Sequence, residues 1–358
     1  MTLPTRVLVV DDGPRECDFL RHVIEQQPDM ECVGVTTDPQ IAHELIRALK
    51  PDVVTLSAAM RGMEQVEALT RLVLISPMPV IVVTPPTERA ARVALRALEM
   101  GAIDCVVGFK PAEPLDQARF AGEIVDKIRI AARAQARRPA RSTCGTAPFP
   151  PRRPAGLGGM CDEKLIFVGA AVGGILATRT LLENLPPDAP AVLLALHVSA
   201  GLTRDYVAWL DRACRMTVKE VVDGEPVLPG KIHVAPDGMH LMVERAGDAC
   251  VARLHLSHAA TGDALPVAAL FSSAARVVGP DALGVMLTGQ GSDGADAMKQ
   301  MYDAGAWNVA QDAASCVVFD MPGHAIAANA IHQVRPLDAI AATLIDHLRS
   351  VARVPGHA

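Results

Sequence analysis

Three short segments of the chain carry residue types that hydrolytic chemistry could use. The first, residues 165–174, predicts a buried strand that runs into a glycine-rich turn and a helix, where a hydrolase of this architecture keeps its nucleophile. At this turn the chain has Ala171 and Val172, and neither side chain can attack a substrate. The other segments contain His197, at the end of an apolar strand, and Asp293, in a loop that opens a helix. Taken singly, His197 could be a structural histidine and Asp293 a helix N-cap.

A second group of chemically capable residues follows the predicted strands of the N-terminal third. Asp11 and Asp12 end the first strand, Ser57 ends the third, Thr84 ends the fourth, and Lys110 follows the fifth. Because parallel strands end at one edge of a sheet, we expect these side chains to share a pocket. The acidic pair would supply oxygen ligands of the kind that Mg²⁺ prefers. The alternative is that both aspartates are structural acids that cap the helix after the strand.

Alternating strands and helices must position these residues. In the first 110 residues, five short apolar runs rich in β-branched residues predict strands buried on both faces, at 6–10, 31–35, 52–56, 79–83 and 103–107. Between the last two runs, a predicted helix has Thr87 as its N-cap and Gly101 just beyond its end. A further amphipathic helix, at about 113–136, closes the unit. Residues 1–115 therefore predict a flavodoxin-like α/β domain with a doubly wound parallel sheet.

Residues 137–161 interrupt this alternation. They contain five arginines, no acidic residue and many prolines and glycines, so they cannot build a core. We expect a semi-stiff linker, either a solvated tether or a segment whose charge lets it lie on an acidic surface. Residues 162–350 then predict a second doubly wound α/β domain. Its predicted strands are 164–168, 191–197, 231–235 and 283–288, its helices are 175–184, 203–214 and 293–304, and a hairpin pairs 240–243 with 250–256.

Composition excludes several classes of function. The chain has 358 residues, half of them hydrophobic, and a formal net charge of −6, without a basic stretch studded with aromatic residues, so we expect no nucleic-acid binding. The eight cysteines lack metal-ligand spacing, which is typical of reduced thiols in a cytoplasmic protein. No apolar run approaches the roughly 18 residues of a membrane span, and the first residues do not resemble a secretory signal. We therefore expect a soluble cytoplasmic protein without membrane insertion.

The N-terminal part is similar to the receiver domain of response regulators. The resemblance rests on residues 6–12, Arg-Val-Leu-Val-Val-Asp-Asp, and residues 50–56, Lys-Pro-Asp-Val-Val-Thr-Leu. In receivers, acidic residues hold Mg²⁺, an aspartate accepts a phosphoryl group, and a threonine and a lysine respond to the product. The corresponding positions here are Asp11, Asp12, Ser57, Thr84 and Lys110. Ser57 occupies the position of the phosphoryl acceptor but lacks the carboxylate that would form an acyl phosphate.

Other receiver positions depart from the family pattern as well. Arg61, Glu64 and Gln65 break the usual Met-Pro-x-Met-Asp-Gly loop, and Lys110 lies two residues later than the usual lysine. We therefore expect a receiver that is kept for its packing surface, with weak Mg²⁺ binding if any. The resemblance implies no required cofactor.

Taken together in chain order, the glycine-rich turn, His197 and Asp293 resemble the catalytic domain of the chemotaxis protein-glutamate methylesterases, the CheB family. Further matches are residues 233–241, His-Val-Ala-Pro-Asp-Gly-Met-His-Leu, and residues 311–322. The order of receiver, linker and esterase also matches, so the resemblance covers nearly the whole chain. In this family a serine of the turn attacks the ester, a histidine takes its proton, and an aspartate orients the imidazole. The resemblance implies His197 as the base and Asp293 as its partner, with Ala171 at the nucleophile position.

Further departures lie near the same face. Val172 replaces a threonine, residues 264–268 replace a polar stretch with Ala-Leu-Pro-Val-Ala, and Gln290 replaces a methionine. Ser199 and Thr203 follow His197, and we expect a loop residue and a helix cap rather than substitute nucleophiles.

These features leave two main hypotheses and a minor one. The protein is either a regulatory module that binds chemoreceptor cytoplasmic domains without hydrolysing their methyl esters, or an active methylesterase and deamidase that uses another nucleophile or a water activated by His197. The resemblance implies chemoreceptors as partners and a chemotaxis histidine kinase as a further candidate. An unrelated nucleotide-binding α/β protein would need a phosphate-cradling loop, and neither glycine-rich turn has that pattern.

Overall fold

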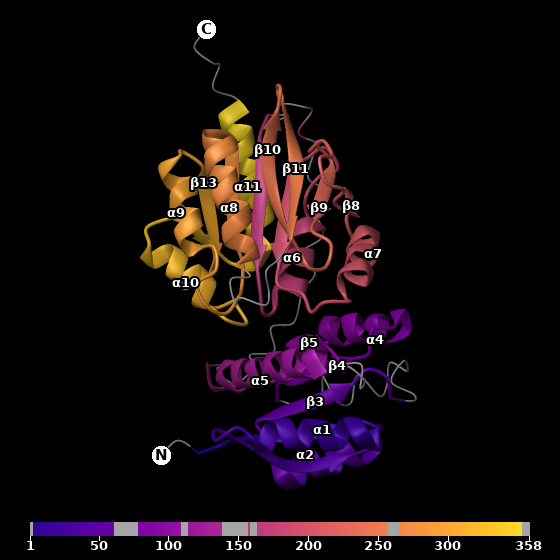
Figure 1. Ribbon diagram of the computed structural model, residues 1–358. Coiled ribbons are helices and arrows are strands. Elements are labelled where there is room, and N and C mark those ends of the chain that lie inside the picture. Colours follow the sequence, from indigo (N-terminus) through magenta and orange to yellow (C-terminus); the bar gives the residue numbers. More distant parts are fainter. Residues whose placement is uncertain are drawn as a thin grey trace. The chain divides into compact units, whose positions relative to one another are not determined.

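The computed structural model describes residues 3–60, 78–108, 114–137, 157, 163–256 and 265–352 (Figure 1). The chain forms two compact units, residues 1–144 and 145–358. Nearly all of the predicted linker, together with Arg61, Glu64, Gln65 and Lys110, lies outside the described residues. Within the described ranges, no helix is long and apolar enough to cross a membrane.

The first unit contains a five-stranded parallel sheet in the order β2-β1-β3-β4-β5. Its strands are β1 (Thr5–Val10), β2 (Met30–Thr36), β3 (Val53–Ser57), β4 (Val80–Thr84) and β5 (Asp104–Val107). Its helices are α1 (Pro14–Glu25), α2 (Pro39–Leu49), α4 (Glu88–Glu99) and α5 (Pro114–Arg137). The prediction of a flavodoxin-like doubly wound domain is confirmed.

Local sequence explains α4 well. The Thr87 hydroxyl accepts a hydrogen bond from the Ala90 N–H at 3.4 Å, which satisfies one of the free donors of the first turn. The apolar side chains of α4 recur at helical spacing and are buried against the sheet. Gly101 follows the helix with a φ of 111°, which favours glycine. The predicted N-cap and the predicted end of this helix are both confirmed.

The second unit is built on a seven-stranded sheet in the order β14-β13-β12-β6-β7-β9-β8, in which every pair is parallel. The strands are β6 (Leu165–Ala170), β7 (Ala191–Leu196), β8 (Thr217–Glu220), β9 (Lys231–Val234), β12 (Ala282–Met286), β13 (Trp307–Gln311) and β14 (Gln333–Arg335). The predicted hairpin is present as an antiparallel pair outside the main sheet, β10 (Met239–Ala246) and β11 (Ala249–Leu256).

Helices cover both faces of this sheet (Figure 1). They are α6 (Gly174–Leu182), α7 (Thr203–Ala213), α8 (Pro266–Val277), α9 (Ala295–Asp303), α10 (Asp320–Ala327) and α11 (Leu337–Ala352). Helix α8 packs against the hairpin strand β10 and against β6 and β7, while α11 packs against α6. The main core lies under α8 and includes Phe167, Phe271 and Met298. This packing holds the carboxyl ends of β6, β7 and β12 side by side.

Candidate functional site

His197, Ala171 and Asp293 follow three neighbouring strands of the second unit. The sheet order places β6 between β12 and β7, and the three residues lie beyond the carboxyl ends of β7, β6 and β12. The His197 N–H donates to the carbonyl oxygen of Ala170 at 3.1 Å, and the Ala171 N–H donates to that of Thr288 at 3.0 Å. The fold therefore joins the histidine segment, the turn and the aspartate loop by main-chain hydrogen bonds.

A short hydrogen bond joins His197 to Asp293. Nε2 of His197 lies 2.7 Å from Oδ2 of Asp293. The Asp293 side chain is only 5% exposed, whereas that of His197 is 38% exposed. This geometry suits a carboxylate that orients an imidazole, and it leaves Nδ1 as the other ring nitrogen.

Asp293 is also bound by the first turn of helix α8. Its Oδ2 accepts from the Val267 N–H at 3.1 Å and its Oδ1 from the Ala268 N–H at 2.8 Å. These are free donors at a helix N-terminus, where the helix dipole favours a negative charge. The alternative that Asp293 is the N-cap of the helix that follows it is wrong, because α9 begins after Gly294 and has no side-chain cap. Asp293 instead stabilises the start of α8.

The turn that carries Ala171 is tightly enclosed. Gly173 has a φ of +78°, and a Cβ there would lie 2.7 Å from Val317, so only glycine fits this turn without strain. A Cβ on Gly289 would lie 2.9 Å from the Cβ of Ala171. The aspartate loop thus passes directly beside the Ala171 side chain, which is itself buried.

Thr288 fixes the backbone around this turn, a role that the sequence analysis missed. Its hydroxyl oxygen lies 3.0 Å from the Val172 carbonyl oxygen and 3.1 Å from that of Val318, and it accepts from the Val318 N–H at 2.9 Å. Its own N–H donates to the side-chain oxygen of Gln311 at 2.8 Å. These contacts could not be predicted from the sequence, because Val172 and Val318 are distant from Thr288 along the chain.

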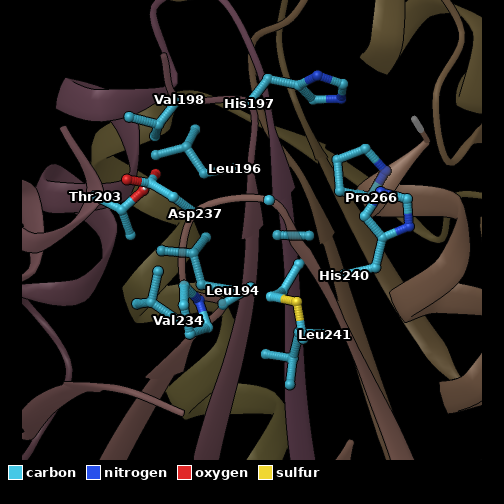
Figure 2. Close-up of a pocket in the computed structure, with 15 residues that line it drawn as sticks. Leu194, Leu196, His197, Val198, Thr203, Val234, Asp237, His240, Leu241 and Pro266 are labelled. Atoms are coloured by element: carbon cyan, nitrogen blue, oxygen red, sulfur yellow. Dashed lines mark hydrogen bonds between the residues drawn. The ribbon is translucent and has the colours of Figure 1, made fainter. Parts of the chain in front are cut away.

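A cavity of about 150 Å³ lies next to His197, and we call it the β7 cavity (Figure 2). Apolar side chains from β7 and β9, including Leu194, Leu196 and Val234, form much of its wall. Asp237 and Thr203 lie together on one side of it. The cavity offers a mostly apolar recess beside the imidazole.

The two histidines of residues 233–241 have different surroundings. His240 lines the β7 cavity. His233 is fully buried, and its Nδ1 lies 3.1 Å from a carboxylate oxygen of Glu225. Burial lowers the pKa of His233, although the Glu225 carboxylate opposes this effect. The neutral His233 imidazole is therefore a structural side chain, buried in the core of the sheet.

Only some of the residues predicted for the receiver pocket line one cavity. Asp11, Asp12 and Ser57 line a cavity of about 200 Å³ at the carboxyl ends of β1 and β3. Thr84 is fully buried at the end of β4, and its hydroxyl donates to the Pro85 carbonyl oxygen at 3.2 Å. Lys110 lies outside the described residues.

Asp11 is a buried carboxylate with local hydrogen-bond donors. It accepts from the Gly13 N–H at 2.9 Å and hydrogen-bonds to the Ser57 side chain. Burial raises its pKa, and these hydrogen bonds oppose the rise. The helix-capping alternative is wrong for Asp11, because α1 has Gly13 as its N-cap without a side-chain cap.

The receiver donors fit a magnesium ion poorly. In the described ranges, no three or more His, Cys, Asp or Glu side chains are grouped so that they could hold a metal ion. Ser57 supplies a hydroxyl where a third carboxylate would be needed, and that side chain is hydrogen-bonded to Asp11. Weak Mg²⁺ binding stays a prediction.

Comparison with known families matches both units. The family model described as CheB methylesterase matches residues 166–344, and the model described as response regulator receiver domain matches residues 7–117. The chain is similar to the protein-glutamate methylesterase/protein-glutamine glutaminase 1 of Albidiferax ferrireducens, with 43% identity over 356 residues that cover 96% of this chain and 94% of the relative. A second relative with the same description, from Cupriavidus metallidurans, is 43% identical over 343 residues and is covered to 96%, as is this chain.

A solved structure is also similar to the second unit. The CheB methylesterase catalytic domain of Thermotoga maritima is 30% identical, with a TM-score of 0.49, and the match covers 51% of this chain and 98% of that domain.

Proposed function

This chain belongs to the CheB methylesterase family, with a receiver domain ahead of the methylesterase domain, and from this we propose that it is a catalytically impaired chemotaxis regulator. It binds the cytoplasmic segments of methyl-accepting chemoreceptors, without hydrolysing their glutamate methyl esters at a rate typical of the family. The relatives are described as protein-glutamate methylesterases and protein-glutamine glutaminases, which supports receptor glutamyl side chains as the ligand chemistry. A cytoplasmic location follows from that ligand.

The observation that carries this proposal is Ala171. His197 and Asp293 are joined by a 2.7 Å hydrogen bond, so two parts of a triad are assembled beside a turn that lacks a hydroxyl. A methyl side chain cannot form the covalent acyl intermediate that divides ester hydrolysis into two easier steps. In serine triads that have lost a member, substrate binding and electrostatic stabilisation still accelerate hydrolysis about 10³–10⁴-fold over the reaction in water.

The neighbouring side chains support this proposal because they are poor substitutes for the missing serine. The Thr288 hydroxyl is bound to main-chain groups of Val172 and Val318. Burial raises the pKa of the Cys316 thiol to about 12, and the nearby Asp312 carboxylate adds to the rise. At neutral pH this sulfur is a thiol rather than the nucleophilic thiolate.

The alternative function is a slow methylesterase in which His197 activates a water molecule. The exposed His197 ring beside the β7 cavity favours this candidate, because an imidazole in that position could take a proton from water. Its turnover would still lack the covalent intermediate.

Methanol release decides between these functions. The unaltered protein, incubated with a methylated cytoplasmic segment of a chemoreceptor, is expected to release methanol at least about a thousandfold more slowly than an active member of the family, while binding the segment in a calorimetric titration. An active member of the family serves as the positive control. Release at a rate typical of that control would contradict the proposal, and its loss in His197→Ala would support the water mechanism.

The receiver supports regulation without phosphorylation. Ser57 hydrogen-bonds to Asp11 and lacks the carboxylate that forms an acyl phosphate. We propose that the receiver contributes a packing surface and that a chemotaxis histidine kinase, if it binds, does not transfer phosphate to it.

A Ser57→Asp variant is expected to gain phosphorylation from acetyl phosphate and Mg²⁺, whereas the unaltered protein stays unmodified. The substitution places a third carboxylate beside Asp11 and Asp12, which supplies both an acceptor and the negative charge that attracts the cation. Intact-protein mass spectrometry measures the added phosphoryl group. The matched control is Ser57→Asn, which has nearly the same shape as aspartate but no charge. Phosphorylation of the unaltered protein on the receiver would contradict the expectation.

A further inference from the structure

The loop that carries His197, residues 197–202, has a main-chain hydrogen bond at each end, and at its far end the Leu202 N–H donates to the Ser199 carbonyl oxygen at 3.2 Å. We call this segment the His197 loop. The His197 N–H donates to the Ala170 carbonyl oxygen at 3.1 Å, which continues the pairing of β6 and β7. Further along, Gly201 adopts a left-handed φ of +93°, and the N-cap of α7, Leu202, has no side-chain oxygen to bind the first turn. Side-chain support for this end of the loop therefore comes from another segment.

Asp237 supplies this support with both of its carboxylate oxygens. Oδ2 accepts from the Gly201 N–H at 2.7 Å, and Oδ1 accepts from the Thr203 hydroxyl. In Figure 2 the Asp237 and Thr203 side chains face each other on one side of the β7 cavity. Thr203 is thus not the helix cap that the sequence predicts, because its hydroxyl donates outward to Asp237. A carboxylate at this position also complements the N-terminal dipole of α7.

The turn between β9 and β10 fixes Asp237 itself. The Met239 N–H donates to the Pro236 carbonyl oxygen at 3.1 Å, and Gly238 has a φ of +73° at the third position of this turn. Strand β9, which leads into the turn, pairs directly with β7, which leads into His197. Two adjacent strands therefore deliver the aspartate and the loop that it holds.

We propose that Asp237 is a positioning residue for His197. It acts through the main chain of the His197 loop, and it touches neither the imidazole nor Asp293 in its hydrogen bonding. The site then uses two carboxylates in parallel roles. Asp293 binds the ring and the start of α8, whereas Asp237 binds the loop and the start of α7. The His197–Asp293 hydrogen bond requires both supports.

The first test uses the protein as it is and needs no activity. In Asp237→Ala, the Gly201 amide is expected to exchange with solvent on the order of tenfold faster, because it loses a charge-assisted hydrogen bond. The low-field proton resonance of His197 Nε2–H, assigned by its loss in His197→Ala, is expected to weaken or broaden. Asp237→Asn keeps an acceptor for Gly201 and a polar group for Thr203, so it is expected to retain both signals.

Asp223→Ala is the matched control for these measurements. Asp223 also accepts a main-chain hydrogen bond, from the Leu254 N–H at 2.9 Å, but that bond holds the hairpin. If Asp237→Ala changes neither Gly201 exchange nor the His197 resonance more than Asp223→Ala does, the positioning role is wrong. If the effects appear and Asp237→Asn reverses them, the role is supported.

A second test, which rests on the proposed function, uses the Ala171→Ser background. There, Asp237→Ala is expected to lower kcat for methyl ester hydrolysis on the order of tenfold and to leave KM nearly unchanged, with recovery in Asp237→Asn. A change confined to KM would overturn the proposal, since it would make Asp237 a ligand-binding residue of the β7 cavity. If Ala171→Ser is inactive, the proposed remnant triad fails on its own, and the resonance and exchange measurements still decide the role of Asp237.

Discussion

Replacing Ala171 with serine is expected to raise methanol release from a methylated chemoreceptor segment by at least about a thousandfold over the unaltered protein. Loss of the nucleophile from a comparable serine triad lowers kcat by about 10⁶, so this gain is well below the available maximum. The new hydroxyl would lie on the turn next to Ala170, whose carbonyl oxygen accepts from the His197 N–H at 3.1 Å, and the carboxylate partner of that histidine lies at 2.7 Å.

The surroundings of Asp293 support the expectation that one substitution suffices. The resemblance to the family implies a polar stretch at residues 264–268, where this chain has Ala-Leu-Pro-Val-Ala, and residue 264 lies outside the described residues. Yet Asp293 is bound there by the main-chain N–H groups of Val267 and Ala268, at 3.1 and 2.8 Å. Backbone donors do not depend on side-chain identity, so the apolar change leaves these hydrogen bonds in place.

Two controls make the gain specific. Val172→Ser introduces a hydroxyl one residue further along the same turn and is expected to give no gain. Adding Asp293→Asn to Ala171→Ser is expected to remove most of the gain, because a neutral amide stabilises the imidazolium poorly. Activity of Ala171→Ser that is no greater than that of Val172→Ser would mean that the site has decayed beyond the nucleophile.

The second large effect is expected in the receiver unit, where Lys127→Met should lower the free energy of unfolding by about 3–5 kcal/mol. Lys127 is buried on α5, and its ammonium group donates to Asp104 at 3.3 Å and to the Cys105 carbonyl oxygen at 2.6 Å. It also lies 3.1 Å from the Glu123 carboxylate. Burial alone would lower the pKa of Lys127, but the Asp104 and Glu123 carboxylates raise it, so the lysine is charged. Without it, the buried Asp104 loses the ammonium group that lies 3.3 Å from its carboxylate.

Urea unfolding followed by two probes separates the units. The two tryptophans, Trp209 and Trp307, both belong to the second unit, so their fluorescence does not report on unfolding of the receiver. Far-ultraviolet circular dichroism reports on both units. Lys127→Met is expected to move the receiver transition in the dichroism signal and to leave the fluorescence transition unchanged. Arg92→Met, which breaks the exposed pair between Arg92 and Glu88 on α4, is the matched control and should cost less than about 1 kcal/mol.

A double variant isolates the unpaired charge. Asp104→Asn combined with Lys127→Met removes both charges, and it is expected to recover most of the stability lost in Lys127→Met. If the double variant is as unstable as Lys127→Met, the loss of stability comes from the missing packing of the lysine stem. It does not then come from the unpaired Asp104 carboxylate.

Sequence patterns were sufficient to predict the two α/β units and the family, and to place His197, Ala171 and Asp293 at the ends of neighbouring strands. Strands buried on both faces must be continuous apolar runs, so β1, β6, β7 and β12 are visible as such runs. Parallel strands place their carboxyl ends at one edge, and this rule brings His197, Ala171 and Asp293 together before any coordinates are known.

Three strands of the second sheet were not found from the sequence, namely β8, β13 and β14. The strands β8 and β14 are short edge strands with exposed polar residues, so they lack the apolar pattern of a buried strand. In β13, Asn308 is fully buried because its side-chain amide donates to the carbonyl oxygens of Met298 and Ala330, at 3.0 and 2.9 Å. A polar residue in a core strand is predictable only when its partners are known.

The groups that support His197 and Asp293 became visible only in the packing of the helices and strands. Asp293 binds the first turn of α8 rather than capping α9, Asp237 holds the His197 loop, and Asp104 pairs with Lys127. Each of these contacts joins segments that are more than twenty residues apart, and none changes the hydrophobic periodicity of its own segment. The spacing of apolar residues determines where strands and helices form, but a hydrogen bond between distant polar groups depends on how those elements pack. The position of Ala171 in the turn after β6 is therefore visible from the spacing of apolar residues, whereas the orientation of His197 depends on how the elements pack.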